Sequence, residues 1–183
     1  MKKGKLFVLS GPSGVGKGTL REKALADIPN LVYSISCTTR QPRPGELDGR
    51  EYRFITHEKF TEDIQQGLFL EYAHVHDDLY GTLKADVVRE LESGNDVLLE
   101  IDVQGALQVR GKMPEAVLVF IDAPSVEELE RRLRNRQTET EQALQHRLAN
   151  ALKELELKQE YDYVIVNDDI ETASRELRQI ILS

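Results

Sequence analysis

Cysteine, tryptophan and long apolar runs are scarce in this chain of 183 residues. It has no tryptophan and a single cysteine, Cys37. One cysteine cannot form an internal disulfide, which fits a reducing compartment. No run approaches the ~18 apolar residues of a membrane span, and the N-terminus lacks the apolar segment of a secretory signal. We therefore expect a cytoplasmic protein with no membrane partner.

The chain also has fewer basic than acidic residues. The 24 lysines and arginines are outnumbered by 32 aspartates and glutamates, which gives a net charge of −8. A protein that coats a nucleic acid is usually basic, so we expect no nucleic-acid partner. Arginines gathered locally can still make a positive cleft in an acidic protein. The four histidines show no metal-ligand spacing with Cys37, and we interpret them as surface or structural residues (His57, His74, His76 and His146).

The most informative segment is rich in glycine and directly follows an apolar run at residues 6–9. It reads GPSGVGKGT over residues 11–19. Glycines allow the backbone to curl so that successive N–H groups converge on phosphate oxygens, and the following helix adds its positive end. Lys17 adds a charge that reaches the outer phosphates of a nucleoside triphosphate. The predicted ATP-binding residues here are Gly11, Pro12, Ser13, Gly14, Val15, Gly16, Lys17, Gly18 and Thr19.

One position departs from the usual phosphate-loop pattern G-x-x-x-x-G-K-S/T. Gly18 stands where serine or threonine is usual, and Thr19 follows one residue later. The hydroxyl at that position normally contacts the Mg²⁺ ion that accompanies ATP. Two alternatives follow: Thr19 supplies the contact instead, or ATP oxygens and water hold most of the metal.

Apolar runs alternate with helical patterns along the chain. Most runs are nearly continuous, as expected of parallel strands that are covered on both faces. Predicted strands lie at 5–10, 31–37, 97–101, 116–121 and 163–166, and predicted helices at 17–27, 84–93, 125–134, 139–159 and 170–181. The sequence therefore predicts an α/β fold, with a P-loop NTPase-type parallel sheet flanked by helices.

Two stretches interrupt this alternation. Residues 38–83 are too long for a simple connection and contain turn signals between short strand candidates, which favours an inserted, mostly β lobe. Residues 134–139 are polar and basic between two helices, which is typical of a mobile flap. Both stretches are expected on the side of the sheet where the phosphate loop lies, where open α/β sheets bind their ligands.

The inserted stretch carries a second set of phosphate-binding residue types. Arg40 and Arg43 lie in a loop that Pro42 and Pro44 stiffen, so they lose less entropy when they converge on one anion. Arginine forks suit phosphate oxygens. Hydroxyls and carboxylates follow at Tyr52, Glu71, Tyr80, Thr82, Glu100 and Asp102. A second phosphorylated molecule beside ATP predicts phosphoryl transfer between the two.

In these segments and others the chain closely resembles the guanylate kinase family. The matching pieces are GPSGVGKGT, SISCTTRQPRPGELDGREYRF, FLEYA, LYGT, LLEIDVQGA and NDD, which span almost the whole chain. The resemblance implies transfer of the ATP γ-phosphoryl group to GMP or dGMP, with Mg²⁺, to give ADP and GDP. It also implies one domain made of a core (1–35, 84–125 and 158–183), a GMP-binding insert (36–83) and a lid (126–157).

The resemblance also implies roles for individual residues. GMP-phosphate ligands are expected at Arg40, Arg43, Tyr52 and Tyr80, and guanine ligands at Ser36, Glu71, Thr82 and Asp102. Catalytic positive charge is expected from Lys17, Arg40, Arg132, Arg136 and Arg147. Asn167 and Asp168 are expected near the ATP adenine, and Thr19 and Glu100 at the metal, through water. Guanine offers two N–H donors that carboxylates accept and adenine does not, so such a site rejects the wrong base by roughly 10⁴–10⁵-fold.

Some positions depart from the family's pattern, and two other functions stay open. Gln137 replaces a usual lid glycine, and residues 76–79 differ from the usual turn before Tyr80, where we expect altered Michaelis constants. One alternative is a guanylate kinase-like module that has lost catalysis and binds proteins. The intact phosphate loop of this chain weighs against that alternative. The other is a kinase for AMP or UMP, against which Glu71 and Asp102 weigh. Both a monomer and a homo-oligomer are compatible with the sequence.

Overall fold

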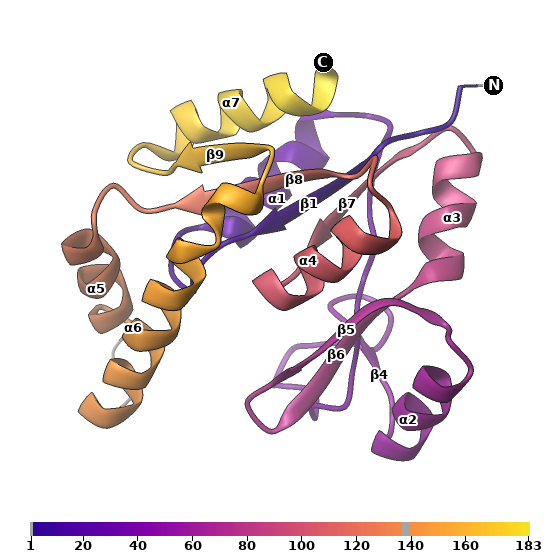
Figure 1. Ribbon diagram of the computed structural model, residues 1–183, viewed down its shortest axis with the longest axis horizontal. Coiled ribbons are helices and arrows are strands. Elements are labelled where there is room, and N and C mark those ends of the chain that lie inside the picture. Colours follow the sequence, from indigo (N-terminus) through magenta and orange to yellow (C-terminus); the bar gives the residue numbers. More distant parts are fainter. Residues whose placement is uncertain (1, 137–139) are drawn as a thin grey trace.

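The centre of the molecule is a five-stranded parallel sheet in the order β2-β7-β1-β8-β9. The computed structural model describes residues 2–136 and 140–183. Figure 1 shows this sheet across the upper part of the view, with β5, β6 and α2 below it. The strands of the parallel sheet are β1 (Leu6–Ser10), β2 (Leu31–Tyr33), β7 (Asp96–Glu100), β8 (Val117–Asp122) and β9 (Tyr163–Val166).

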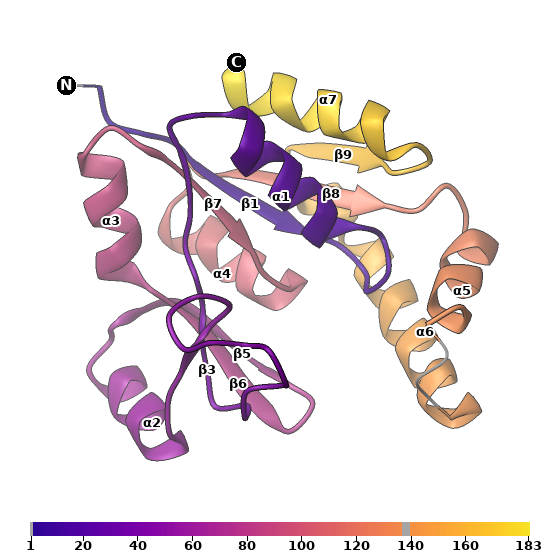
Figure 2. The same cartoon turned by 180° about the vertical axis from the view of Figure 1, so that it is seen from behind.

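Helices cover both faces of this sheet because its strands are apolar on both sides. In β1, Phe7 and Leu9 belong to the core formed with α1 and α7, whereas Leu6 and Val8 belong to the core formed with α3 and α4. Figures 1 and 2 show opposite sides, with α4 in front of the sheet in the first and α1 in the second. The helices are α1 (Lys17–Asp27), α3 (Lys84–Glu92), α4 (Val103–Lys112) and α7 (Ile170–Leu182).

A second, smaller sheet has the order β4-β3-β6-β5. Strands β5 and β6 form an antiparallel hairpin, and β3 pairs with β6 on one side and β4 on the other. Helix α2 packs on this sheet through Phe60, whose ring stacks on Phe69 with centroids 4.4 Å apart. The elements are β3 (Cys37–Thr38), β4 (Arg53–Phe54), α2 (His57–Gln65), β5 (Phe69–Val75) and β6 (Asp78–Leu83).

A pair of helices follows β8 and lies across from the β5–β6 hairpin (Figure 1). Ser125 begins the first of them, because its hydroxyl accepts a hydrogen bond from the N–H of Glu128 at 3.1 Å. The Glu128 carboxylate accepts hydrogen bonds from Arg131 and Arg132 on the same helix. The elements are α5 (Val126–Arg134), α6 (Glu141–Glu156) and the 3₁₀ turn η1 (Lys158–Glu160).

The predicted α/β class is confirmed, but several elements differ from the predictions. The strand expected at 31–37 is wrong as a single element, because the chain leaves the large sheet after β2 and enters the small sheet at β3. Helices α2 and α4 are not predicted by the sequence. The helix expected at 139–159 ends at Glu156. Residues 137–139 lie outside the described residues. They include Gln137, part of the expected flap and the first residue of this expected helix. In the parts of the chain that are described, no helix has the length and apolarity to cross a membrane.

Candidate active site

The glycine-rich loop lies between the end of β1 and the start of α1. Gly11 and Gly16 have φ angles of +150° and +93°, which residues with side chains rarely adopt. A Cβ on Gly16 would lie 2.6 Å from the Asn167 amide nitrogen, and one on Gly11 would lie 2.2 Å from the Ile121 carbonyl oxygen. Both positions therefore require glycine. Such a turn ahead of a helix N-terminus is the backbone arrangement that binds phosphate.

Lys17, the first residue of α1, is held against this loop. Its Nζ donates hydrogen bonds to the carbonyl oxygens of Gly11 at 2.5 Å and Pro12 at 3.0 Å. Burial lowers the pKa of Lys17, while the negative charges of Glu100 and Glu154 oppose that shift. The ammonium group is thus kept beside the loop, where the outer phosphates of a nucleotide would lie.

Asn167 joins the end of β9 to the phosphate loop. Its buried amide donates from Nδ2 to the carbonyl oxygen of Val15 at 2.7 Å. Arg132 on α5 donates from Nη2 to the backbone carbonyl of Asn167 at 3.0 Å. Hydrogen bonds of Asn167 therefore connect the phosphate loop, β9 and α5. Asp168 follows as an exposed residue.

The two side chains expected at a metal have different surroundings. Thr19 is exposed on α1 and does not line the cavity described below. Glu100 does line it, but its carboxylate is ion-paired with Arg21, whose guanidinium lies 4.8 Å from the centre of the Tyr33 ring. Among the described residues, no group of three or more His, Cys, Asp or Glu side chains could hold a metal ion. A cation here would therefore take most of its ligands from phosphate oxygens and water.

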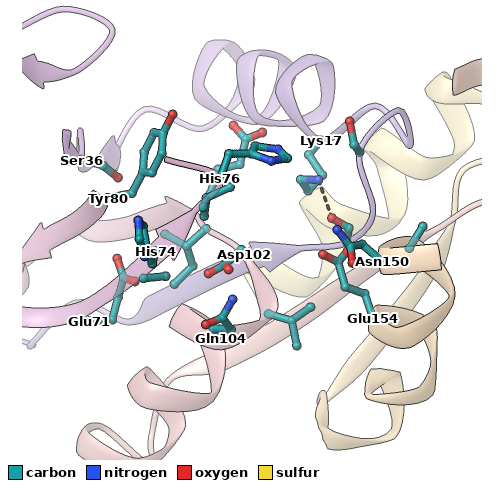
Figure 3. Close-up of a pocket in the computed structure, with 18 of the residues that line it drawn as sticks. Lys17, Ser36, Glu71, His74, His76, Tyr80, Asp102, Gln104, Asn150 and Glu154 are labelled. Atoms are coloured by element: carbon teal, nitrogen blue, oxygen red, sulfur yellow. Dashed lines mark hydrogen bonds between the residues drawn. The ribbon is translucent and has the colours of Figure 1, made fainter. Parts of the chain in front are cut away.

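A cavity of about 780 Å³ lies between the phosphate loop, the small sheet and α6. Figure 3 shows Lys17 on one side of it, Glu71 on the other and Asp102 between them. The volume lies within the range of small-molecule sites. Of the residues predicted from the sequence, it is lined by Gly11, Ser13, Lys17, Ser36, Tyr52, Glu71, Tyr80, Glu100, Asp102 and Arg147.

Two carboxylates line the cavity beyond Lys17, with Asp102 in the middle and Glu71 at the end away from the loop. Thr82 donates from Oγ1 to Glu71 Oε1 at 2.6 Å, and burial raises the pKa of Glu71 to about 7. Asp102 caps α4 by accepting a hydrogen bond from the N–H of Gly105 at 2.9 Å, and burial raises its pKa as well. Acceptors that are poorly solvated suit a ligand edge that brings N–H donors.

The structure separates the two arginines of the proline-stiffened loop. Arg40 donates to both carboxylate oxygens of Glu46, at 2.9 and 3.1 Å, and lies 5.3 Å from the centre of the Tyr52 ring. The Tyr80 ring packs edge-on against Tyr52 with centroids 5.8 Å apart. Arg40, Tyr52 and Tyr80, three of the four residues predicted to bind the GMP phosphate, therefore lie next to one another. Arg43 is exposed and does not line the cavity.

Helix α6 brings five polar side chains to the cavity: His146, Arg147, Asn150, Lys153 and Glu154. Arg147, Asn150 and Glu154 share one face of the helix. Arg147 is predicted from the sequence, whereas Asn150 and Glu154 are missed. The signal was their spacing of three and seven residues from Arg147, which places them on the same side of a helix. Burial raises the pKa of Glu154 to about 7.

The other predicted lid arginines, the histidines and the cysteine occupy different places. Arg132 is engaged with Asn167, and Arg136 is exposed after α5, where its charge contributes to lowering the pKa of Lys17. Cys37 is buried in β3, and burial raises its pKa to about 11, which suits a packing role rather than nucleophilic attack. Three exposed histidines line the cavity: His74, His76 and His146.

Fold and cavity together define the class of this protein. A parallel sheet whose first strand leads into a glycine-rich loop, with lysine at the start of the next helix, is a P-loop NTPase-type fold. The small sheet and the α5–α6 pair enclose room for a second ligand beside the loop. The chain belongs to the guanylate kinase family, whose model matches residues 3–183.

Individual relatives agree with this membership over almost the full length. The chain is similar to a guanylate kinase of Rubrobacter xylanophilus, with 51% identity over 99% of this chain and 95% of the relative. It is 48% identical to one of Clostridioides difficile, over 100% of this chain and 89% of that one. A crystal structure of guanylate kinase from Anaplasma phagocytophilum superposes with a TM-score of 0.82 at 36% identity, covering 99% and 86% of the two chains. A shikimate kinase from Bacteroides thetaiotaomicron, 17% identical with a TM-score of 0.52 over 98% and 99% of the chains, shares the fold.

Proposed function

We propose that this chain transfers the γ-phosphoryl group of ATP to GMP, and to dGMP, giving ADP and GDP. The observation that carries the proposal is one cavity that joins the phosphate-loop Lys17 to two poorly solvated carboxylates, Glu71 and Asp102. One end suits the charge of a triphosphate. The other offers acceptors for the N1–H and 2-amino groups of guanine. Relatives named guanylate kinase match nearly the whole chain, which supports the same reaction.

We assign the two nucleotides to opposite ends of the cavity. ATP is assigned to residues 11–19, with Asn167 and Asp168 near its adenine. The GMP phosphate is assigned to Arg40, Arg43, Tyr52 and Tyr80, and guanine to Ser36, Glu71, Thr82 and Asp102. The transferring phosphoryl group is assigned to Lys17, Arg40, Arg132, Arg136 and Arg147. In this scheme 36–83 is the GMP-binding insert, 126–157 is the lid, and the remaining segments (1–35, 84–125 and 158–183) are the core.

Positioning and positive charge provide most of the catalysis in phosphoryl transfer, because the transition state is loose and its charge lies on oxygen. Lys17 turns from the carbonyl oxygens of Gly11 and Pro12 to a phosphate oxygen when ATP enters. Arg40 exchanges its contact with Glu46 for the GMP phosphate. Arg147, which already faces the cavity, approaches the transferring group as α6 moves toward the small sheet. This closure also excludes water, which would otherwise compete with GMP for the phosphoryl group.

Mg²⁺ fits this site as a companion of ATP rather than as an ion held chiefly by side chains. Gly18 offers no hydroxyl, Thr19 is exposed, and Glu100 is paired with Arg21. When bound, Mg²⁺ neutralises charge on the β- and γ-phosphate oxygens. Of the two predicted side chains, Glu100 lines the cavity, so we assign it a contact through water in competition with Arg21.

The experiment that tests this function offers GMP, dGMP, AMP, UMP and CMP separately with Mg-ATP and measures ADP production. We expect rapid turnover with GMP and dGMP and a preference over AMP of roughly 10⁴-fold. Absence of turnover with all five in a folded protein would favour the protein-binding module. Faster turnover with AMP or UMP than with GMP would favour a kinase of different specificity and would remove Glu71 and Asp102 from guanine recognition.

A further inference from the structure

The proposed reaction assigns no role to Glu154, whose carboxyl group lies at the phosphate-loop end of the cavity. It projects from the cavity-facing side of α6, one helical turn beyond Asn150. Figure 3 shows both side chains reaching from α6 toward Lys17. The residue is partly buried, and within residues 2–136 and 140–183 its carboxyl group makes no hydrogen bond. A polar group in this position is open to a ligand that enters beside the loop.

Charged groups from several elements act on Glu154. Burial and the negative charge of Asp102, at the start of α4, disfavour its ionised form, whereas Lys17 on α1 favours it. The balance raises the pKa of Glu154 to about 7. His146, Arg147 and Lys153 line the cavity from the same helix, and the Tyr161 hydroxyl lies close enough to respond to the charge of Glu154. At neutral pH this carboxyl group is therefore divided between its two protonation states.

A bound nucleotide changes this balance in one direction. Its phosphates bring several negative charges to the end of the cavity that Glu154 faces, and like charges at short range are costly. The same phosphates draw the ammonium group of Lys17 to themselves, which weakens the interaction that favours the carboxylate. A neutral carboxyl group, by contrast, can donate its O–H to a phosphate oxygen. Both effects favour uptake of a proton on binding.

We propose that Glu154 binds the phosphates of ATP or ADP in its neutral form, taking a proton from solvent and donating its O–H to a phosphate oxygen. Asn150, on the same face of α6, donates from its side-chain amide beside it. The inference rests on the proposed function, since it requires a nucleotide at the phosphate loop. Glu154 is then a contact of the nucleotide that links its affinity to pH.

Calorimetry with Mg-ADP, in the absence of GMP, measures this proton directly. Binding to the full chain at pH 6, 7 and 8, in buffers of different ionisation enthalpy, gives the number of protons taken up. We expect uptake by the wild type above pH 7 and loss of that uptake in Glu154→Gln. We also expect the variant to bind as the wild type does at pH 6 and about 3- to 10-fold more tightly at pH 8, because its side chain is already neutral. Glu156→Gln, an exposed glutamate on the same helix, is the matched control and should behave as the wild type.

The outcomes separate this inference from the proposed function. Equal proton uptake in wild type and Glu154→Gln would overturn the inference, as would a weakening of binding by the same factor at every pH. In either case normal Mg-ADP binding leaves the proposed function standing. Absence of any nucleotide binding overturns both. Should Glu154→Gln not fold, ¹³C NMR of the glutamate carboxyl groups decides: we expect two wild-type resonances that titrate near pH 7, those of Glu71 and Glu154, of which Glu71→Gln removes one. The resonance that remains in Glu71→Gln should shift to higher pH with Mg-ADP, and the absence of that shift counts against the inference.

Discussion

Thr82 donates from Oγ1 to Glu71 Oε1 across 2.6 Å, between the paired strands β6 and β5. Both side chains are almost fully buried, with 0% and 2% of their surface exposed. The hydrogen bond orients the carboxyl group, while burial raises its pKa to about 7. A carboxylate kept in such a place is costly to the folded protein until a ligand provides donors. This relationship yields predictions on both stability and specificity.

Glu71→Gln should stabilise the folded protein at pH 8. Between the ordinary pKa of a glutamate, near 4.3, and about 7, the folded state binds more protons than the unfolded state, so stability falls as pH rises through this window. The amide has no charge to desolvate, and its oxygen can still accept from Thr82. We expect a gain of about 1–3 kcal/mol in the free energy of unfolding at pH 8 and little gain at pH 4. Urea unfolding at both pH values checks this, with the exposed Glu115→Gln as control.

The same variant should lose preference for GMP. An amide presents one acceptor and one unwanted donor to the guanine edge, so kcat/KM for GMP should fall by about 10- to 100-fold with ATP binding unchanged. In the wild type, protonation below pH 7 removes an acceptor in the same way, so kcat/KM for GMP should decline as pH falls through about 7. Steady-state kinetics from pH 5.5 to 8.5 measure both effects. Unaltered base preference in Glu71→Gln would remove this residue from the guanine site.

Gly105→Ala should impair GMP binding through Glu71, the predicted ligand that a Cβ at this position would meet. A Cβ on Gly105 would lie 2.3 Å from Glu71 Oε2, so the carboxyl group must move away from its bond with Thr82. We expect KM for GMP to rise at least about tenfold, since a misplaced acceptor forfeits its hydrogen bond. Gly111→Ala is the matched control on the same helix, α4, because a Cβ there meets nothing within 4 Å. It should leave KM unchanged and stabilise the protein by about 0.5–1 kcal/mol. Equal KM values for the two variants would contradict the prediction.

Local sequence patterns predicted much of the fold, and the failures have physical causes. The predictions for α1 at 17–27 and β9 at 163–166 agree with the structure to the residue. Helix α4 escaped prediction because Gly105 and Gly111 are poor helix formers, and the Asp102 cap and the buried Val103, Ala106 and Val109 override propensity. Residues 31–37 look like one strand because nothing local reveals that the chain changes sheets after Tyr33.

The cavity shows what a motif can and cannot predict about side chains. The spacing of the glycine-rich loop predicted where Lys17 would lie, because backbone geometry alone determines that position. The ion pair of Arg21 with Glu100 could not be read from the sequence, since it joins residues 79 apart that meet only in the folded protein. The exposure of Arg43 was equally hidden, because a loop arginine has the same sequence signature whether it faces a cavity or solvent. Glu154 could have been predicted from the sequence, because it lies at helical spacing from Arg147.

Lys17→Ala should nearly abolish turnover. The ammonium group is the point charge beside the loop, and removing one such group that stabilises developing charge lowers kcat by about 10²–10³-fold. Because the lost group is buried and poorly solvated, the protein should remain as stable as the wild type. Lys23→Ala on the same helix, where the ammonium pairs with Glu171 at 2.6 Å, is the control and should retain full kcat. Single-turnover kinetics with saturating Mg-ATP and GMP measure the difference; near-normal kcat in Lys17→Ala would end its assigned role.

Gly18→Ser should reduce the Mg²⁺ requirement. A Cβ at Gly18 meets nothing within 4 Å, so the side chain is accommodated, and serine is a better helix former than glycine in α1. The new hydroxyl would occupy the position from which phosphate loops ordinarily contact the metal. We expect half-saturation at a several-fold lower Mg²⁺ concentration, with kcat within about threefold of the wild type, measured at fixed total ATP.

Thr19→Ala separates the two ways in which this chain could hold the metal. The Thr19 side chain is exposed and does not line the cavity, so its removal should leave the Mg²⁺ dependence as it is in the wild type. A higher Mg²⁺ requirement in Thr19→Ala would instead show that Thr19 supplies the missing hydroxyl contact. An unchanged requirement in both variants would mean that neither position reaches the ion. The phosphate oxygens of ATP and water would then have to hold it, with Glu100 acting through water once Arg21 releases its carboxylate.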